Sequence, residues 1–179
     1  AAGNAAPQVV RTIVVGDTTV PVITLKGEAD ITSWEEFVYN LNNPKHTIDI
    51  ALVGKYVELK DSYKSISESF IHTSSFSRCK VNLHWICSEK LDADSAIESL
   101  KNMDGVLVAP GFGPRGIEGK LYAVQYAREN KIPFFGICLG MQASVIEYAR
   151  NVLDYDLAHS TEMNPESSYP VIDIMEEQK

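Results

Sequence analysis

Short apolar runs and longer segments with helical spacing follow one another along the chain from residue 47 onward. The apolar runs, which predict buried strands, are Ile48–Val53, Val81–Cys87, Gly105–Ala109 and Phe134–Ile137. The segments with apolar residues three or four apart, which predict helices, are Ser62–Phe76, Asp94–Lys101, Ile117–Glu129 and Gln142–Val152. Strands separated by helices predict an α/β fold, in which a parallel, Rossmann-like sheet carries helices on both faces.

The same pattern predicts which residues of one helix face the core, and one further strand. In the predicted helix Ser62–Phe76, the residues expected to face the core are Tyr63, Ile66, Phe70 and Ile71. After Leu153 the pattern weakens, and Tyr169–Ile174 predicts one further strand.

The N-terminal residues 1–29 suggest no function. Ala1–Gln8 is small and polar, which is typical of a mobile end. Val9–Leu25 is rich in residues that favour strands, and a turn at Gly16 and Asp17 would make it a β-hairpin.

Residues 30–46 predict a linker helix that leads into a main domain at residues 47–179. Asp30 or Thr32 is expected to cap this helix, and acidic residues follow in its first turn. Pro44 follows two asparagines and ends it.

Composition narrows the class of protein. The 179 residues are 45% apolar and 22% charged, which is ordinary for a soluble globular protein. The net charge of −8 argues against a nucleic acid or an anionic membrane as the main partner, although a local basic pocket remains compatible with it. Three cysteines without a C-x-x-C pair favour a reducing compartment, and no run of 18 apolar residues occurs, so we expect a cytoplasmic protein.

The segment Phe134–Gln142 is the most informative part of the chain. It places Cys138 between Gly136 and Gly140, where a strand gives way to a helix. This is the cysteine form of a nucleophile elbow, a sharp turn that lifts the nucleophile above the carboxyl edge of a parallel sheet. The helix that begins after the cysteine favours a thiolate, and the N–H of Leu139 is a candidate oxyanion donor.

A buried, unreactive cysteine at a strand end remains the alternative, because free cysteine is among the most buried residue types. The two flanking glycines favour the catalytic interpretation, because an elbow needs small residues where neighbouring chain comes close. A second junction, at residues 107–116, carries glycines after a buried strand. Gly111 is therefore a candidate second oxyanion donor facing Cys138, although a glycine and a proline after a strand usually form only a turn.

Together these segments resemble the class I glutamine amidotransferases and, more narrowly, the glutaminase part of the CTP synthase family. The segments that carry the resemblance are Val53–Leu59, Asp61–Ser65, the Gly-Phe-Gly-x-Arg-Gly loop through Gly119, the elbow with Met141 and Gln142, and Ser160–Glu162. The resemblance covers residues 30 to 173, and its strength lies in several motifs that agree in order and spacing.

The resemblance implies roles for particular residues. Cys138 would be the nucleophile, and the amides of Leu139 and Gly111 would form the oxyanion hole. Glutamine would be bound by Gly111, by the turn formed by Leu139, Gly140, Met141 and Gln142, and by Glu162, whose carboxylate would take the substrate ammonium. Considered alone, Glu162 would be an exposed loop carboxylate.

The resemblance also implies ligands and partners. Lys64 and Phe112 would lie near the site of a GTP effector, although a surface lysine and a loop aromatic have ordinary structural explanations too. The ammonia released from L-glutamine would serve the ATP- and Mg-dependent amination of UTP to CTP in a synthetase domain of the same enzyme. The complete enzyme would be a homo-oligomer, a tetramer. No metal or cofactor is expected in this chain itself.

The chain departs from the family pattern in three respects. Ser62 replaces a more usual alanine, and Pro110 stands where the family often has glycine, which removes one N–H. The family also completes its triad with a His and a Glu, and none of the four histidines, His46, His72, His84 and His159, matches that pattern. We therefore expect a fragment of a longer enzyme, inactive by itself, that also lacks the synthetase half.

Two other functions stay open from the residues alone. One is another cysteine-elbow amidotransferase or hydrolase on the same scaffold, and the other is an interaction module without catalysis. The lysine- and tyrosine-bearing segment from Lys55 to Lys64 favours the CTP synthase resemblance over both.

Overall fold

The computed structural model describes residues 8–15, 17–24, 30–175 and 177. The chain divides into two compact units, Ala1–Glu36 and Phe37–Lys179. In the first unit, β1 (Gln8–Val15) and β2 (Thr18–Thr24) pair antiparallel, with Val15 opposite Thr18, which confirms the predicted hairpin. Gly16 of the predicted turn, Leu25 and most of the segment Ala1–Gln8 lie outside the described residues.

The predicted helix that begins near Asp30 is α1 (Thr32–Asn42). The side chain of Asp30 accepts a hydrogen bond from the N–H of Thr32 at 3.1 Å, which supports the first turn. In the middle of α1, the ring of Phe37 lies 5.5 Å from that of His72.

Four parallel strands form the central sheet: β3 (His46–Gly54), β4 (Cys79–Cys87), β5 (Gly105–Val108) and β6 (Phe134–Gly136). Their order is β4-β3-β5-β6, and each pair is parallel. The predicted parallel α/β sheet is therefore confirmed. Because all four strands point the same way, every loop that follows a strand begins at one edge of the sheet.

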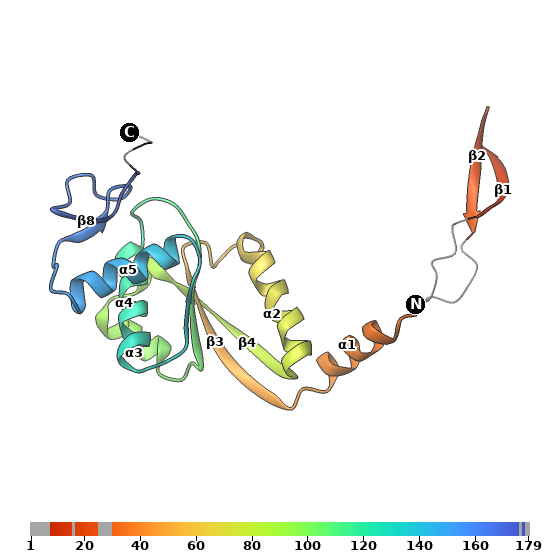
Figure 1. Cartoon of the computed structure of the whole chain (residues 1–179). Helices are drawn as coiled ribbons and strands as arrows, with labels where there is room; N and C mark the ends of the chain where they lie inside the picture. Colours follow the sequence, from red (N-terminus) through yellow and green to blue (C-terminus); the bar gives the residue numbers. More distant parts are fainter. Residues whose placement is uncertain (1–7, 16, 25–29, 176, 178–179) are drawn as a thin grey trace. The chain divides into compact units, whose positions relative to one another are not determined.

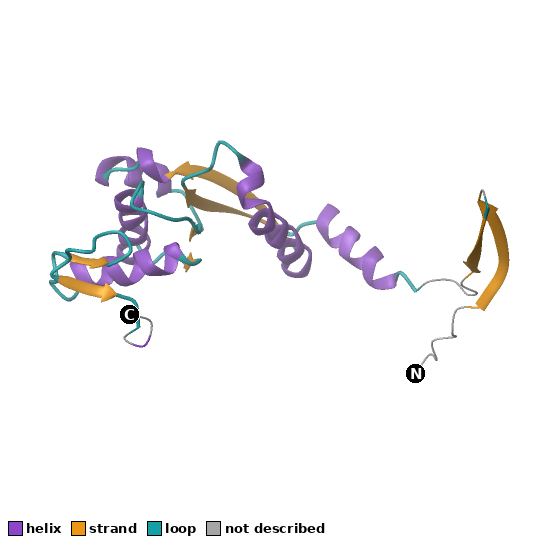
Figure 2. Cartoon of the chain, turned by 90° about the horizontal axis from the view of Figure 1, so that it is seen from above, coloured by secondary structure: helices purple, strands orange, loops and turns teal. Residues whose placement is uncertain are grey.

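Helices cover both faces of this sheet (Figures 1 and 2). The short 3₁₀ turn η1 (Lys60–Tyr63) and α2 (Lys64–Ser77) pack on one face, where Leu52 and Leu107 are buried. The other face carries α3 (Ala93–Leu100), α4 (Ile117–Glu129) and α5 (Leu139–Asn151), with η2 (Ser88–Lys90) before α3. None of the described helices has the length and apolar character needed to cross a bilayer.

The prediction for the core face of α2 is right for three residues and wrong for one. Tyr63 is buried, and Ile66 and Phe70 pack against the same cluster. Ile71, however, is 43% exposed. The reason is geometric, because one residue beyond Phe70 corresponds to a rotation of about 100° around the helix axis, away from the sheet.

Beyond α5 the chain forms a two-stranded ribbon that the sequence predicted only in part. The expected strand near residue 170 is β8 (Tyr169–Ile172), and it pairs in parallel with β7 (Ala158–Ser160). No pattern in the sequence indicates β7, since three residues are too few to show an alternation. Arg150 on α5 fixes this ribbon by donating from Nε to the carbonyl of Ala158 at 2.8 Å.

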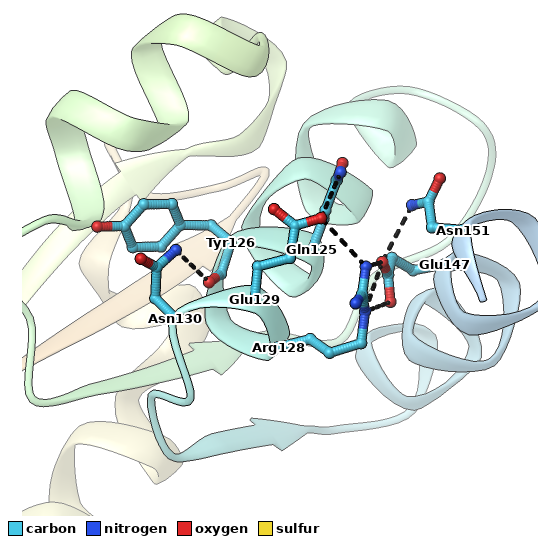
Figure 3. Close-up of polar contacts among 7 residues, drawn as sticks. All are labelled: Gln125, Tyr126, Arg128, Glu129, Asn130, Glu147 and Asn151. Atoms are coloured by element: carbon cyan, nitrogen blue, oxygen red, sulfur yellow. Dashed lines mark hydrogen bonds and ion pairs between the residues drawn. The ribbon is translucent and has the colours of Figure 1, made fainter.

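A charged contact joins α4 and α5 (Figure 3). Arg128 on α4 donates from Nη2 to Oε1 of Glu147 on α5 at 2.7 Å and from Nε to both carboxylate oxygens. Glu147 is 1% exposed, and Asn151 donates to it as well, at 3.0 Å. The Arg128 side chain is 32% exposed, so only the carboxylate of the pair is fully buried.

Candidate active site

Cys138 occupies a strained turn between β6 and α5. Its backbone angles are φ 54° and ψ −110°, a conformation that residues other than glycine rarely adopt. The predicted sharp turn is therefore observed. Such strain persists only where the surrounding structure imposes it, and it is concentrated at functional sites.

The two glycines of the elbow are required by close packing. A Cβ added at Gly140 would lie 2.1 Å from the carbonyl oxygen of Val108, and one at Gly136 would lie 2.5 Å from the carbonyl carbon of Gly140. Only hydrogen fits at either position. The G-x-C-x-G spacing thus allows the first turn of α5 to rest directly on the ends of β5 and β6.

The sulfur of Cys138 is available to a ligand. Cys138 is exposed, whereas Cys79 and Cys87 are only partly so. The carbonyl of Cys138 accepts from the N–H groups of Met141 and Gln142 at 3.0 and 3.1 Å, which closes the first turn of the helix. The cysteine therefore sits at the positive end of the α5 dipole, where a thiolate is favoured.

The register of the sheet brings the two predicted glycine junctions together. Val108, the last residue of β5, pairs with Gly136, the last residue of β6. The loop that contains Gly111 and the turn that contains Cys138 consequently start side by side. Among the described residues, no hydrogen bond uses the N–H of Gly111 or of Leu139 as its donor, so both groups remain available to an oxyanion.

Two buried lysines that the sequence reasoning did not single out as site residues hold this loop. Lys120 on α4 is 0% exposed and donates from Nζ to the carbonyl of Ala109 at 2.7 Å. Lys55, which follows β3 and is 6% exposed, donates to the carbonyls of Phe112 and Gly113, at 2.5 and 2.7 Å.

A signal for Lys120 was present in the sequence. It lies three residues after Ile117 and four before Val124, on the apolar face of the predicted helix, and a lysine at such a position calls for a buried acceptor. Burial lowers the pKa of Lys120 to about 8, with a further contribution from the charge of Lys55, while the charge of Cys138 acts in the opposite direction.

Glu162 and Gln142 were both predicted to contact glutamine. Glu162 is exposed in the turn after β7, and its N–H donates to Oγ of Ser160 at 3.2 Å. Its charge acts on Lys55, whose pKa is lowered chiefly by burial and raised in part by this carboxylate. Gln142 has a buried side-chain oxygen without a hydrogen-bond partner among the described residues. A ligand that donates a hydrogen bond to such an unpaired buried acceptor gains more binding free energy than one that donates to an acceptor already paired.

The residues predicted to act near an effector are both at the carboxyl edge of the sheet. Lys64 begins α2 and forms an exposed ion pair with Glu68 at 2.5 Å, and that hydrogen bond raises the pKa of Lys64. Phe112 is 81% exposed. Beside the same loop, the Arg115 guanidinium lies 5.7 Å from the ring centre of Tyr56 and 3.4 Å from Glu89.

Two of the histidines have polar partners in the structure. His84 is exposed and lies 2.6 Å from Asp49. His159 is buried in β7, and its Nδ1 accepts from the N–H of Ser160 at 3.0 Å. Burial lowers the pKa of His159, and the charge of Arg150 lowers it further.

Comparison with known proteins agrees with this geometry. The family described as glutamine amidotransferase class-I matches residues 58–174, which include the elbow, the loop around Gly111 and Glu162. The chain belongs to the class I glutamine amidotransferases. Cys138 and the two glycines that flank it lie inside the matched region.

Similar proteins add detail to the family assignment. A CTP synthase of Flavobacterium psychrophilum is 62% identical over 154 residues, which are 86% of this chain and 29% of that protein. A CTP synthase of Cytophaga hutchinsonii is 58% identical over 157 residues, 88% of this chain and 29% of the relative. The chain therefore spans less than a third of the length of these curated relatives.

A solved structure resembles this amidotransferase chain as well. It is the glutaminase domain of the Trypanosoma brucei CTPS with bound acivicin, which is 41% identical and superposes with a TM-score of 0.70. The match covers 74% of this chain and 52% of that one.

Proposed function

We propose that this chain carries the glutamine-hydrolysing site of a CTP synthase, with Cys138 as its nucleophile. The observation that carries the proposal is the exposed thiol of Cys138 in a strained backbone conformation at the N-terminus of α5. The identity of 62% with a protein named CTP synthase supports the assignment to this enzyme rather than to another amidotransferase.

The reaction follows from the groups around the thiol. The sulfur of Cys138 attacks the side-chain carboxamide carbon of glutamine, and the N–H groups of Leu139 and Gly111 donate to the oxygen as it becomes negative. The C–N bond then breaks, the nitrogen takes up the proton that the thiol has lost and leaves as ammonia, and the acyl group remains on the sulfur as a thioester. Water hydrolyses the thioester to glutamate and restores the thiol.

The substrate would be held on both sides of the thiol. Glu162 takes the α-ammonium group of glutamine, and the unpaired side-chain oxygen of Gln142 accepts a further hydrogen bond from the substrate. Gly140 and Met141 line the turn on which the substrate rests; the side chain of Met141 is 52% exposed.

The remaining assignments concern the complete enzyme. Residues 30–46 would be the linker, and residues 47–179 would belong to the glutaminase domain, inside which the family match falls. Ammonia would pass to a synthetase domain that aminates UTP with ATP and Mg²⁺, GTP would act near Lys64 and Phe112, and the enzyme would work as a cytoplasmic tetramer.

Covalent labelling tests the proposal on this chain. Acivicin is bound in the Trypanosoma brucei glutaminase domain, so we expect it to modify Cys138 faster than Cys79 or Cys87, and excess L-glutamine to slow the modification. Peptide mass mapping identifies the modified residue, and Cys138→Ser is the control. Equal labelling of the three cysteines, or labelling that glutamine does not affect, would contradict the proposal in favour of a non-catalytic module.

A further inference from the structure

Three carbonyl oxygens of one short loop are bound by two buried ammonium groups. Lys120 Nζ donates to Ala109, and Lys55 Nζ donates to Phe112 and Gly113. The bound carbonyls flank Gly111 on both sides. The loop that carries a predicted oxyanion donor is therefore anchored before and after that donor.

The position of Gly111 against the lysines is close. A Cβ added at Gly111 would lie 3.7 Å from Lys120 Nζ and 3.7 Å from Lys55 Cδ. Both lysine side chains thus lie within van der Waals contact distance of the Cβ position of Gly111. Since the peptide groups at both ends are fixed, the N–H of Gly111 between them has little freedom to turn.

The charges of these lysines are not used in ion pairs. Among the salt bridges of the described residues, none includes Lys55 or Lys120. Buried charges in proteins are usually paired with an opposite charge, because removing an ion from water is costly. Here both ammonium groups bind backbone carbonyls at the edge of the sheet where Cys138 lies, which suggests a role connected with the site.

We propose that Lys55 and Lys120 are positioning residues of the glutaminase site, which hold the loop of residues 109–113 so that the N–H of Gly111 stays directed at the substrate oxygen. This inference rests on the proposed function. The lysines do not contact substrate; they act through the loop. The positive charge of Lys120 also interacts with the charge of Cys138.

The groups that face the lysines define the pH dependence of the effect. Lys120 faces Lys55 from the loop after β3 and Cys138 from the elbow, and Lys55 faces Arg115, Glu89 and Glu162. Lys120 loses its charge as the pH rises through about 8. Its contribution should therefore be complete below that pH and decline above it.

Two electrophiles separate positioning from general thiol reactivity. The chloroketone analogue of glutamine alkylates the thiolate with loss of chloride while its ketone oxygen occupies the oxyanion position. Iodoacetamide alkylates with loss of iodide and has no comparable binding requirement. The variants are Lys120→Met and Lys55→Met, which keep the aliphatic stem, and the matched control is Lys101→Met, a half-exposed lysine paired with Glu98.

We expect Lys120→Met and Lys55→Met to slow chloroketone labelling of Cys138 by about tenfold or more, because a misplaced donor is costly in rate. Iodoacetamide labelling should change by less than about threefold, and the control should change neither. The ratio of wild-type to Lys120→Met rates with the chloroketone should fall toward one above pH 9, which a packing role alone would not produce.

The outcomes separate the two proposals. If wild-type Cys138 shows no preference for the chloroketone over Cys79 and Cys87, the proposed function is wrong. If the wild type shows that preference and both lysine variants keep it while remaining folded by circular dichroism, the positioning role is wrong. Equal losses with both electrophiles, or a pH-independent ratio, would also overturn it in favour of a structural role.

Discussion

Gly140 rests directly on the carbonyl of Val108, since a Cβ at Gly140 would lie 2.1 Å from that oxygen. Both partners are backbone at the junction of β5 and α5, so no side chain can rotate away to make room. The contact fixes how closely the first turn of the helix approaches the sheet, and with it the position of the preceding Cys138.

We therefore expect Gly140→Ala to damage both stability and the site. Overpacking a core costs about 1–3 kcal/mol, and a clash with backbone should fall at the upper end. Acivicin labelling of Cys138 should slow by about tenfold or more. Urea unfolding and mass mapping measure the two effects.

Gly113→Ala is the matched control for this variant. Unlike Gly140, Gly113 has a positive φ, of 73°, and open space surrounds its Cβ position. Its replacement should cost only about 1 kcal/mol, the usual penalty for a side chain in that conformation. Equal destabilisation by the two substitutions would mean that the contact with Val108 costs no more than a side chain at an uncrowded position of positive φ.

The strained backbone at Cys138 predicts that the reactive thiol is held in place at a cost in the stability of the fold. Glycine adopts a positive φ without penalty, whereas alanine retains the Cβ that makes φ 54° unfavourable. Cys138→Gly should therefore be more stable than Cys138→Ala by about 1 kcal/mol, and neither variant should be labelled at this position. Thermal and urea unfolding of the pair provide the comparison, and a more stable alanine variant would show that the turn is unstrained.

The parallel sheet and the elbow could be predicted from sequence because each depends on local pattern. Four apolar runs separated by helical segments predict a parallel sheet. The two glycines around Cys138 indicate close backbone contacts within the same junction. The strand order and the pairing of Val108 with Gly136 then follow from the fold.

Other features depend on contacts between distant residues and carry no local pattern. Lys120 and Ala109 are joined by a hydrogen bond across a strand-to-helix loop, and nothing in the spacing of either residue predicts its partner. The strand β7 forms because β8, which begins at Tyr169, pairs with it. The exposure of Ile71 depends on where α2 begins relative to the sheet.

The pair formed by Arg128 and Glu147 predicts an asymmetric response to substitution. Arg128→Met leaves a buried carboxylate with Asn151 as its remaining partner, which should cost about 2–3 kcal/mol, less than for a wholly buried pair because the arginine is one-third exposed. Combining Arg128→Met with Glu147→Gln should recover part of this loss, since no uncompensated charge remains. Urea unfolding of the three variants tests the coupling, and additive losses would show that the charges do not interact.

The burial of Lys120 predicts a rise in stability with pH. Its pKa falls from 10.5 to about 8 in the folded protein, so between these values the unfolded chain binds more protons than the folded one. Below pH 8 both states are protonated, and the fold bears the full cost of the buried charge, about 3 kcal/mol. This cost is relieved progressively as the pH rises from 8 toward 10.5.

The variant Lys120→Met isolates this contribution, because every other titrating group is common to both proteins. Between pH 7.5 and pH 9.5 the free energy of unfolding of the wild type should rise by about 2 kcal/mol relative to that of the variant. Urea unfolding at the two pH values measures the difference, with Lys101→Met as a control that should follow the wild type. If the free energies of unfolding of the wild type and Lys120→Met differ by the same amount at both pH values, Lys120 keeps an ordinary pKa. Its buried charge, bound to Ala109, would then cost the fold little.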